Sequence, residues 1–371
     1  MNRTLLPAVA LVSAALLGGC ASKTNQEQAE MRWQDARARV MVELASDQLE
    51  QGSIDDARAS IERARAASPR LAESHILAAR CDLEEDNLRS AADALVLARM
   101  LEAEPKVHAE AAHLQGVIAE RWRETDEAVR RHRESTVLNP IEPAYAVALA
   151  ETLVAADQAD EAAELLERRL PQSQGEASIF DALGQVYQAL GRNDEAAEMF
   201  RRAVIYAPND DDLAARAAFA MLEAGDPASS VTTLRRLAEE PHFRDRPSTH
   251  VALGEALLAD ANPREALRAF QTAARLDRTS RAAWLGVAKA ALDRRDAAVA
   301  DQALQRLPSD DVDADLLRGL VRYRQGRFAE AAATLEPLAP NDPTAACLRS
   351  LCLIALDDQT AMANSDFATV D

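Results

Sequence analysis

The chain has 371 residues, of which 48% are hydrophobic and only 4% aromatic, and its formal net charge is −19 at pH 7. Because alanine and leucine supply most of the apolar side chains, the composition favours close-packed helices over sheets, in which β-branched and aromatic residues are enriched. A protein with this negative charge repels other anionic surfaces. The charge therefore disfavours nucleic acid and anionic membrane surfaces as partners.

Residues 1–19 have the layout of a secretory signal peptide. One cation, Arg3, precedes an apolar run over residues 5–17 that only Pro7 and Ser13 interrupt. This run is shorter than the roughly 20 apolar residues that a transmembrane helix needs. We therefore expect a targeting segment here and not a membrane span.

The sequence Leu17-Gly18-Gly19-Cys20 at the end of this segment resembles the lipobox of bacterial lipoproteins. In that family the signal peptide is cleaved before the cysteine, whose thiol is diacylated. The resemblance implies that Cys20 is the lipidated first residue of the mature chain, and Ser22 implies sorting to the outer membrane, facing the periplasm. Two or three acyl chains give a stable anchor. The alternative is an ordinary cleaved signal with an accidental cysteine.

Residues 20–37 are expected to hold the lipidated cysteine, a polar tether and the start of the first helix. Within them, residues 21–30 are polar and show no periodicity. We expect this tether to lift the folded part of the chain off the bilayer.

A pattern of about 34 residues then recurs over residues 38–345. Its twentieth position holds a small residue at intervals of 31 to 37 residues, at Ala57, Ala91, Ala128, Ala162, Ala196, Ser230, Ala266, Ala300 and Ala331. The nine units start near Ala38, Ala72, Ala109, Pro143, Ala177, Asp211, Pro247, Arg281 and Val312. Small residues at positions 8 and 20 allow two antiparallel helices to approach closely. Glycine at position 15, as at Gly191, can end the first helix in the left-handed conformation.

The unit at residues 177–210 places Phe180, Leu183, Gly184 and Tyr187 at positions 4, 7, 8 and 11. On these residues and their recurrence, the chain is identified as a member of the tetratricopeptide repeat family. The resemblance implies an all-α fold, a right-handed α-solenoid of about nine helix-turn-helix repeats in which neighbouring units bury each other's apolar faces.

The chain after the last repeat divides into two short segments. Residues 346–356 resemble the C-terminal capping helix that closes such arrays. Residues 357–371 are expected to be a disordered tail.

Two repeats carry unusual residues at core positions. His132 and Ser135 replace core-type residues in the third repeat, and Ser230 and Leu237 do so in the sixth. We expect soft spots or bends at these places.

Motifs for chemistry are missing from the sequence. His108 and His113 are five apart and miss a common helical face, and no phosphate loop or nucleophile motif occurs. Cys81, Cys347 and Cys352 lack CxxC spacing and are expected to be small buried residues. The arginines do not cluster along the sequence, so no arginine-rich site is expected. We predict no enzymatic activity, no metal site and no cofactor.

In tetratricopeptide arrays the first helix of each repeat lines the concave face, mainly through positions 2, 5, 9, 12 and 13. The resemblance implies a groove for an apolar or amphipathic peptide or helix. The candidate groove residues are Val42, Leu49, Ile76, Leu83, Val147, Val154, Phe219, Leu222, Val251, Leu258, Leu285, Leu292, Leu316 and Tyr323. For position 12 in particular, packing against the neighbouring repeat is an equal alternative. The carboxylate-clamp mode is disfavoured, because Val42 and Ser46 stand where that mode needs Lys and Asn.

These features predict a lipid-anchored periplasmic scaffold that binds partner proteins or peptides in its groove. Residues 36–69 also resemble the type IV pilus assembly lipoproteins that pilot secretin subunits, which gives a second hypothesis. A third is an adaptor for peptidoglycan hydrolases or proteases.

Overall fold

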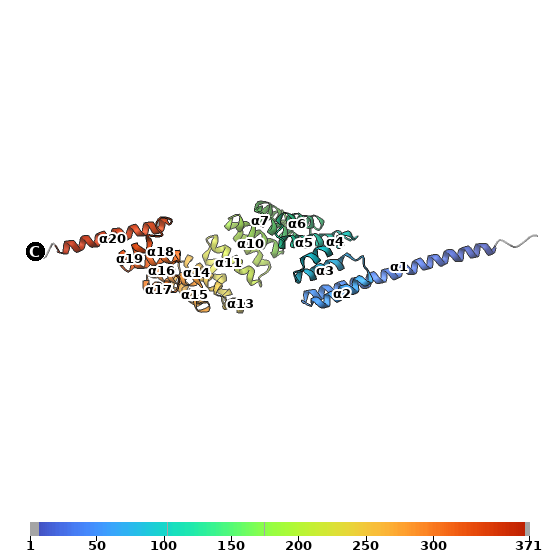
Figure 1. Ribbon diagram of the computed structural model, residues 1–371, viewed down its shortest axis with the longest axis horizontal. Coiled ribbons are helices and arrows are strands. Elements are labelled where there is room, and N and C mark those ends of the chain that lie inside the picture. Colours follow the sequence, from blue (N-terminus) through green and yellow to red (C-terminus); the bar gives the residue numbers. More distant parts are fainter. Residues whose placement is uncertain (1–6, 102, 174, 368–371) are drawn as a thin grey trace, which may run out of the picture. The chain divides into compact units, whose positions relative to one another are not determined.

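The computed structural model describes residues 7–367 apart from 102 and 174, and their side chains over residues 25–357 apart from residue 27. Within these residues the regular structure consists of twenty α-helices and one short 3-10 helix, without a strand (Figure 1). The predicted all-α fold is confirmed.

Two compact units make up the chain, unit 1 over residues 1–190 and unit 2 over residues 191–371. Unit 1 contains α1 (Pro7–Glu50), α2 (Ile54–Ala67), α3 (Ala72–Glu84), α4 (Leu88–Met100), α5 (Pro105–Arg121), α6 (Thr125–Leu138), α7 (Pro143–Ala155), α8 (Ala159–Glu167), the 3-10 helix Leu170–Gln172 and α9 (Ala177–Ala189). Unit 2 contains α10 (Asn193–Tyr206), α11 (Asp211–Glu223), α12 (Pro227–Leu237), α13 (Pro241–Arg244), α14 (Pro247–Ala259), α15 (Pro263–Leu276), α16 (Arg281–Asp293), α17 (Ala297–Leu304), α18 (Val312–Arg324), α19 (Phe328–Leu335) and α20 (Pro343–Phe367).

The helices follow the predicted repeat frame. Seven of the nine predicted repeat starts are the first residues of helices, namely α3, α7, α9, α11, α14, α16 and α18. All eight alanines predicted at position 20 are fully buried. Because a methyl group is the only side chain there, the two helices of a repeat can pack closely.

First and second helices play different parts in the stacking. In unit 1 the first helices α1, α3 and α5 contact one another in turn, and in unit 2 α14, α16 and α18 do the same. A second helix packs between its own first helix and the next one, as α15 does between α14 and α16. Such stacking buries apolar faces that a single helical hairpin would leave in water. Each unit is therefore a stretch of the predicted α-solenoid.

The turn inside each repeat is built on a residue with positive φ at position 15. Glycine provides it at Gly52, Gly191, Gly225 and Gly326, as predicted. In the other five repeats a residue with a side chain takes the same conformation, with φ between 55° and 61°, at Asp86, Arg123, Asp157, Ala261 and Arg295. The turn geometry is thus retained where glycine is absent, although the left-handed region disfavours a Cβ atom.

The predicted departures from the pattern lie in the core. His132 and Ser135 are fully buried, and the Ser135 hydroxyl donates a 2.8 Å hydrogen bond to the His132 carbonyl. In the sixth repeat Ser230 and Leu237 are also buried, and the Ser230 hydroxyl has no hydrogen-bond partner. The short helix α13 follows this repeat and accounts for its longer spacing to the next.

Both terminal helices are longer than the sequence suggests. The backbone of α1 is helical from Pro7, through the segment expected to be a tether, and α20 continues past Leu356 to Phe367. The residues predicted as tether and tail include many helix formers and no proline or glycine at 21–30 or 357–367, so nothing stops a helix there. The Cys20 side chain and residues 1–6 and 368–371 lie outside the described residues, and the lipidation prediction stays a prediction.

The three described cysteines are free thiols. Cys81 and Cys352 are buried as predicted, and burial raises the pKa of both thiols. Cys347 is exposed, so the prediction of a buried residue is wrong there, because its position on α20 faces away from α19 and the Cys352 cluster.

Candidate functional site

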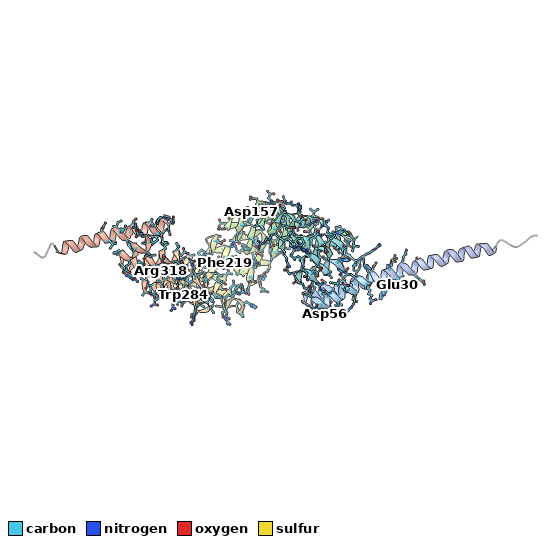
Figure 2. All side chains as sticks on the ribbon, viewed as in Figure 1. Glu30, Asp56, Asp157, Phe219, Trp284 and Arg318 are labelled. Carbon is cyan, nitrogen blue, oxygen red and sulfur yellow. The ribbon has the colours of Figure 1, made fainter. Side chains whose placement is uncertain are left out.

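Three first helices of unit 2 expose the side chain at the ninth repeat position. Phe219 lies on α11 (Figure 2) and is 42% exposed. Glu255 of α14 and Lys289 of α16 are exposed as well. Since α14 contacts both α11 and α16, equivalent positions follow one another across the three helices. We call Phe219, Glu255 and Lys289 the first-helix row.

Partly exposed apolar side chains flank this row. Leu222, Val251 and Leu258 are half-buried and pack against the main hydrophobic cluster of unit 2. On α18, Leu316 and Tyr323 are half-buried against a second cluster, in which the Tyr323 and Phe328 ring centroids lie 5.4 Å apart. The side chains beside Phe219 are therefore apolar, but they expose only part of their surface to solvent.

Four predicted groove residues require correction. Ile76, Leu83, Leu285 and Leu292 are at most 6% exposed and belong to the hydrophobic clusters between helices. Buried side chains offer no surface to a partner. At these positions the alternative of packing against the neighbouring repeat holds, because these side chains lie in apolar clusters built from successive helices.

In unit 1 the predicted groove residues Val42, Leu49, Val147 and Val154 are half-buried. Val42 and Leu49 pack against a cluster that includes Ile61. Between these two pairs the third repeat places His113 and Glu120 at positions 5 and 12, so its first helix presents polar groups where unit 2 presents leucine and valine.

A polar cluster extends from these residues into the core of unit 1. The Nδ1 atoms of His113 and His132 are 3.2 Å apart, and His132 Nε2 lies 3.3 Å from Glu120 Oε1. The Thr152 hydroxyl donates a 2.5 Å hydrogen bond to the same Glu120 oxygen. The His113 ring also lies 5.1 Å from the Tyr145 ring, centroid to centroid. The cluster thus joins α5, α6 and α7.

Burial sets the charges of this cluster. It lowers the pKa of His113 to about 4, with the neighbouring His132 acting in the same direction, so His113 is neutral at pH 7. For Glu120, burial is outweighed by hydrogen bonding to His132 and Thr152, and its pKa is lowered. Burial, together with the charges of Glu120 and Asp181, raises the pKa of Glu151.

The row in unit 2 contains one perturbed carboxyl group. Although the Glu255 side chain reaches solvent, neighbouring helices partly desolvate its carboxyl group, which raises its pKa, and the charge of Lys289 opposes that shift. The two residues therefore offer a partner one weakly acidic and one basic group next to the apolar Phe219. Of the three, the sequence identified only Phe219 as a site residue, because position 9 varies in chemistry from repeat to repeat.

The described residues contain neither a candidate membrane span nor a candidate metal site. No described helix is both long and apolar enough to cross a membrane. In the same part of the chain, no three His, Cys, Asp or Glu side chains gather as a metal site would require.

Comparisons with protein families agree with the repeat pattern. Two family models, each described as tetratricopeptide repeat, match residues 142–307 and residues 293–346. Together they span residues 142–346, more than half of the 371 residues. A search of curated proteins finds no match.

Solved structures of tetratricopeptide repeat proteins resemble the chain in fold alone. The C-terminal part of a repeat protein from Cytophaga hutchinsonii has 14% identity and a TM-score of 0.48, covering 63% of this chain and 97% of that one. A repeat protein from Parabacteroides merdae has 14% identity and a TM-score of 0.45, covering 69% and 99%. The pilF protein of Pseudomonas aeruginosa has 14% identity and a TM-score of 0.42, covering 69% and 97%.

Proposed function

Because the chain belongs to the tetratricopeptide repeat proteins, we propose that it is a protein-binding scaffold whose unit 2 holds a partner segment along the first-helix row. Proteins of this family are generally scaffolds without enzymatic activity. Membership of the family supports the kind of function, and the first-helix row supports the location of the binding surface.

The exposure of Phe219 is the observation that carries the proposal. An aromatic side chain that leaves 42% of its surface in water can gain from being covered, and aromatic residues are frequent anchors of protein interfaces. Half-buried Leu222 and Val251 would extend the apolar contact, while Glu255 and Lys289 would pair with polar groups. An amphipathic helix or an extended peptide with one apolar anchor fits this arrangement.

A matched pair of variants tests the place of binding. Phe219 on the first helix α11 is 42% exposed and Tyr206 on the second helix α10 is 43% exposed. We expect Phe219→Ala to lower the amount of partner retained by the tagged full chain at least about 10-fold, as loss of an aromatic anchor does. Tyr206→Ala should leave retention unchanged. Equal retention by both variants would contradict the proposal.

The identity of the retained partner separates the more specific alternatives. Secretin subunits would favour the pilus assembly hypothesis, and a peptidoglycan hydrolase or a protease would favour the adaptor hypothesis. Retention of any other envelope protein would be consistent with the general scaffold function and would exclude both the pilus assembly and the adaptor hypothesis.

We further propose that acylated Cys20 holds this scaffold at the periplasmic face of the outer membrane. The lipobox-like Leu17-Gly18-Gly19-Cys20 and the following Ser22 support it. We expect Cys20→Ala to release the protein from the membrane fraction while its helical circular dichroism is unchanged. Mass spectrometry should find the wild-type N-terminus at an acylated Cys20. Membrane fractionation that does not change in the variant would refute the anchor.

A further inference from the structure

Unit 2 has a second candidate binding surface, lined mainly by second helices and the turns beside them. A cavity of about 660 Å³ is lined by Arg268 and Arg275 of α15, Arg278 in the turn after it, Trp284 at the start of α16, and Arg306 just beyond α17. Most of these residues belong to second helices or to the turns beside them. The sequence did not predict this cluster, because Arg306 is 28 residues from Arg278, the nearest of the other three in the chain.

The four guanidinium groups have no carboxylate partner. Among the described residues none of them lies within ion-pair distance of an Asp or Glu, and only Arg275 has a side-chain hydrogen bond, 2.9 Å to the Thr272 hydroxyl. The nearby Arg281, by contrast, pairs with Asp311 and Asp313 at 2.6 Å. In a chain of net charge −19, four unpaired arginines around one cavity form a local reversal of the field.

Trp284 is held in place at this cavity. Its indole N–H donates a 2.9 Å hydrogen bond to the Arg278 carbonyl, and the ring packs against a small alanine cluster with Ala273 and Ala283. The Arg306 guanidinium carbon lies 5.8 Å from the ring centroid, within cation–π range. The indole therefore provides a fixed flat surface between positive charges.

The cavity continues into a neighbouring one. A second cavity, of about 400 Å³, shares Gln271, Trp284 and Arg306 with the first and extends to Gln302 and Gln305. The two together form one cleft, in which arginines predominate in the first cavity and glutamines in the second. Amides can both donate to and accept from a peptide backbone.

We propose that this cleft binds an acidic peptide segment of a partner protein. Carboxylates of the segment pair with Arg268, Arg275 and Arg306, since guanidinium groups bind carboxylates in a planar two-bond geometry. An apolar side chain beside them packs on Trp284. The two adjoining cavities, of about 660 and 400 Å³, offer more space than a single small anion fills, and an anionic bilayer would be repelled by the rest of the acidic surface. The proposal rests on the two cavities and does not require binding along the first-helix row.

The test measures fluorescence anisotropy of a fluorescein-labelled hexapeptide of alternating aspartate and leucine with the full chain. We expect binding that weakens as salt rises, because the paired charges are screened. The asparagine–leucine twin peptide should bind at least about 10-fold more weakly, since charge-assisted hydrogen bonds are lost. Inorganic phosphate and phosphatidylglycerol vesicles serve as the competing probes.

Two double variants of equal charge locate the site. Arg268→Gln with Arg275→Gln should weaken the acidic peptide at least about 10-fold. Arg264→Gln with Arg294→Gln, two exposed arginines outside the cavity, should change its affinity by less than about 2-fold. Peptide binding that both double variants weaken equally, or no peptide binding, would overturn the proposal. Vesicle binding without peptide binding would assign a membrane surface instead, and saturation by millimolar phosphate would assign a small-anion site; either result overturns it.

Discussion

Repeats three and seven bury different rings at position 24 of the repeat, which is in the second helix. The ring is His132 in repeat three and Phe270 in repeat seven. In repeat seven the Phe270 ring lies so close to Gly254 and Gly286 that a Cβ atom on either glycine would fall within 2.7 Å of it. In repeat three the His132 ring occupies the same place, and a Cβ atom on Gly116 would lie 2.5 Å from it. Glycine in the first helix therefore makes room for a ring in both units.

The two rings differ in what they impose on the first helix. Phe270 needs only apolar neighbours and lies in the main hydrophobic cluster of unit 2. His132 brings polar atoms into the core, and His113 and Glu120 of α5 lie beside it. In repeat three a polar core residue thus coincides with a polar first helix, whereas repeat seven combines Phe270 with Val251 and Leu258 at positions 5 and 12 of α14.

The largest expected effect comes from removing the apolar ring. Phe270→Ala should lower the free energy of unfolding by about 3–5 kcal/mol, because a fully buried ring is replaced by a cavity between two glycines. Hydrogen exchange measured by mass spectrometry should show faster exchange in α14, α15 and α16. A loss below about 1 kcal/mol would contradict this prediction, because it would mean that the helices move together and fill the cavity.

Acid should act on unit 1 through His113. The pKa of His113 is about 4 in the folded chain, below the ordinary value of about 6.5, so the unfolded chain binds more protons between these pH values. The stability of unit 1 should therefore fall as the pH drops from about 6.5 to about 4, by roughly 1–3 kcal/mol. His113→Gln should remove this part of the pH dependence. The measurement is the exchange rate of α5 and α6 amides at several pH values, and equal pH profiles for the two proteins would contradict it.

Replacing the polar ring should have a smaller effect, in the opposite direction to the Phe270 change. Leu335 packs over Gly319 in repeat nine with the geometry that His132 has over Gly116, so a leucine fits this frame. His132→Leu should raise the stability of unit 1 by about 1 kcal/mol, since a buried polar group with poor pairing is removed. Urea denaturation followed by helical circular dichroism tests it. A destabilised variant would show that the contact with Glu120 outweighs the burial of the ring.

The smallest effect concerns the turns. Ala261 has a φ of 55°, a conformation that glycine adopts without strain. Ala261→Gly should stabilise unit 2 by about 0.5–1 kcal/mol. Ala298→Gly, in the exposed part of α17, should cost about the same amount, because glycine weakens a helix. Thermal denaturation of both variants gives the comparison, and a shift of the same sign in both would contradict it.

The repeat frame was predictable because its spacing is a local property of the sequence. Alanine at position 20 and glycine at Gly52 or Gly326 mark the helix contacts and the turns directly. The non-glycine turns at Arg123 and Arg295 carry no such mark, since tertiary packing forces their conformation.

The candidate sites were less predictable because they depend on neighbouring repeats. Whether Ile76 or Leu285 is buried depends on the size of residues across the helix interface, which an average repeat position does not contain. The cleft around Trp284 joins residues of α15, α16, α17 and the adjoining turns, and Arg306 lies far along the sequence from Arg268, Arg275 and Arg278. Sequence reasoning located the exposed Phe219 but not the charged residues that follow it in the row.

Photo-crosslinking in cells tests the scaffold function most directly. A photoreactive phenylalanine at position 219 or at position 206 samples two similarly exposed sites, one on the first helix α11 and one on the second helix α10. We expect a crosslinked partner protein from position 219 and none from position 206. Crosslinks of equal yield from both positions, or from position 206 alone, would contradict binding along the first-helix row.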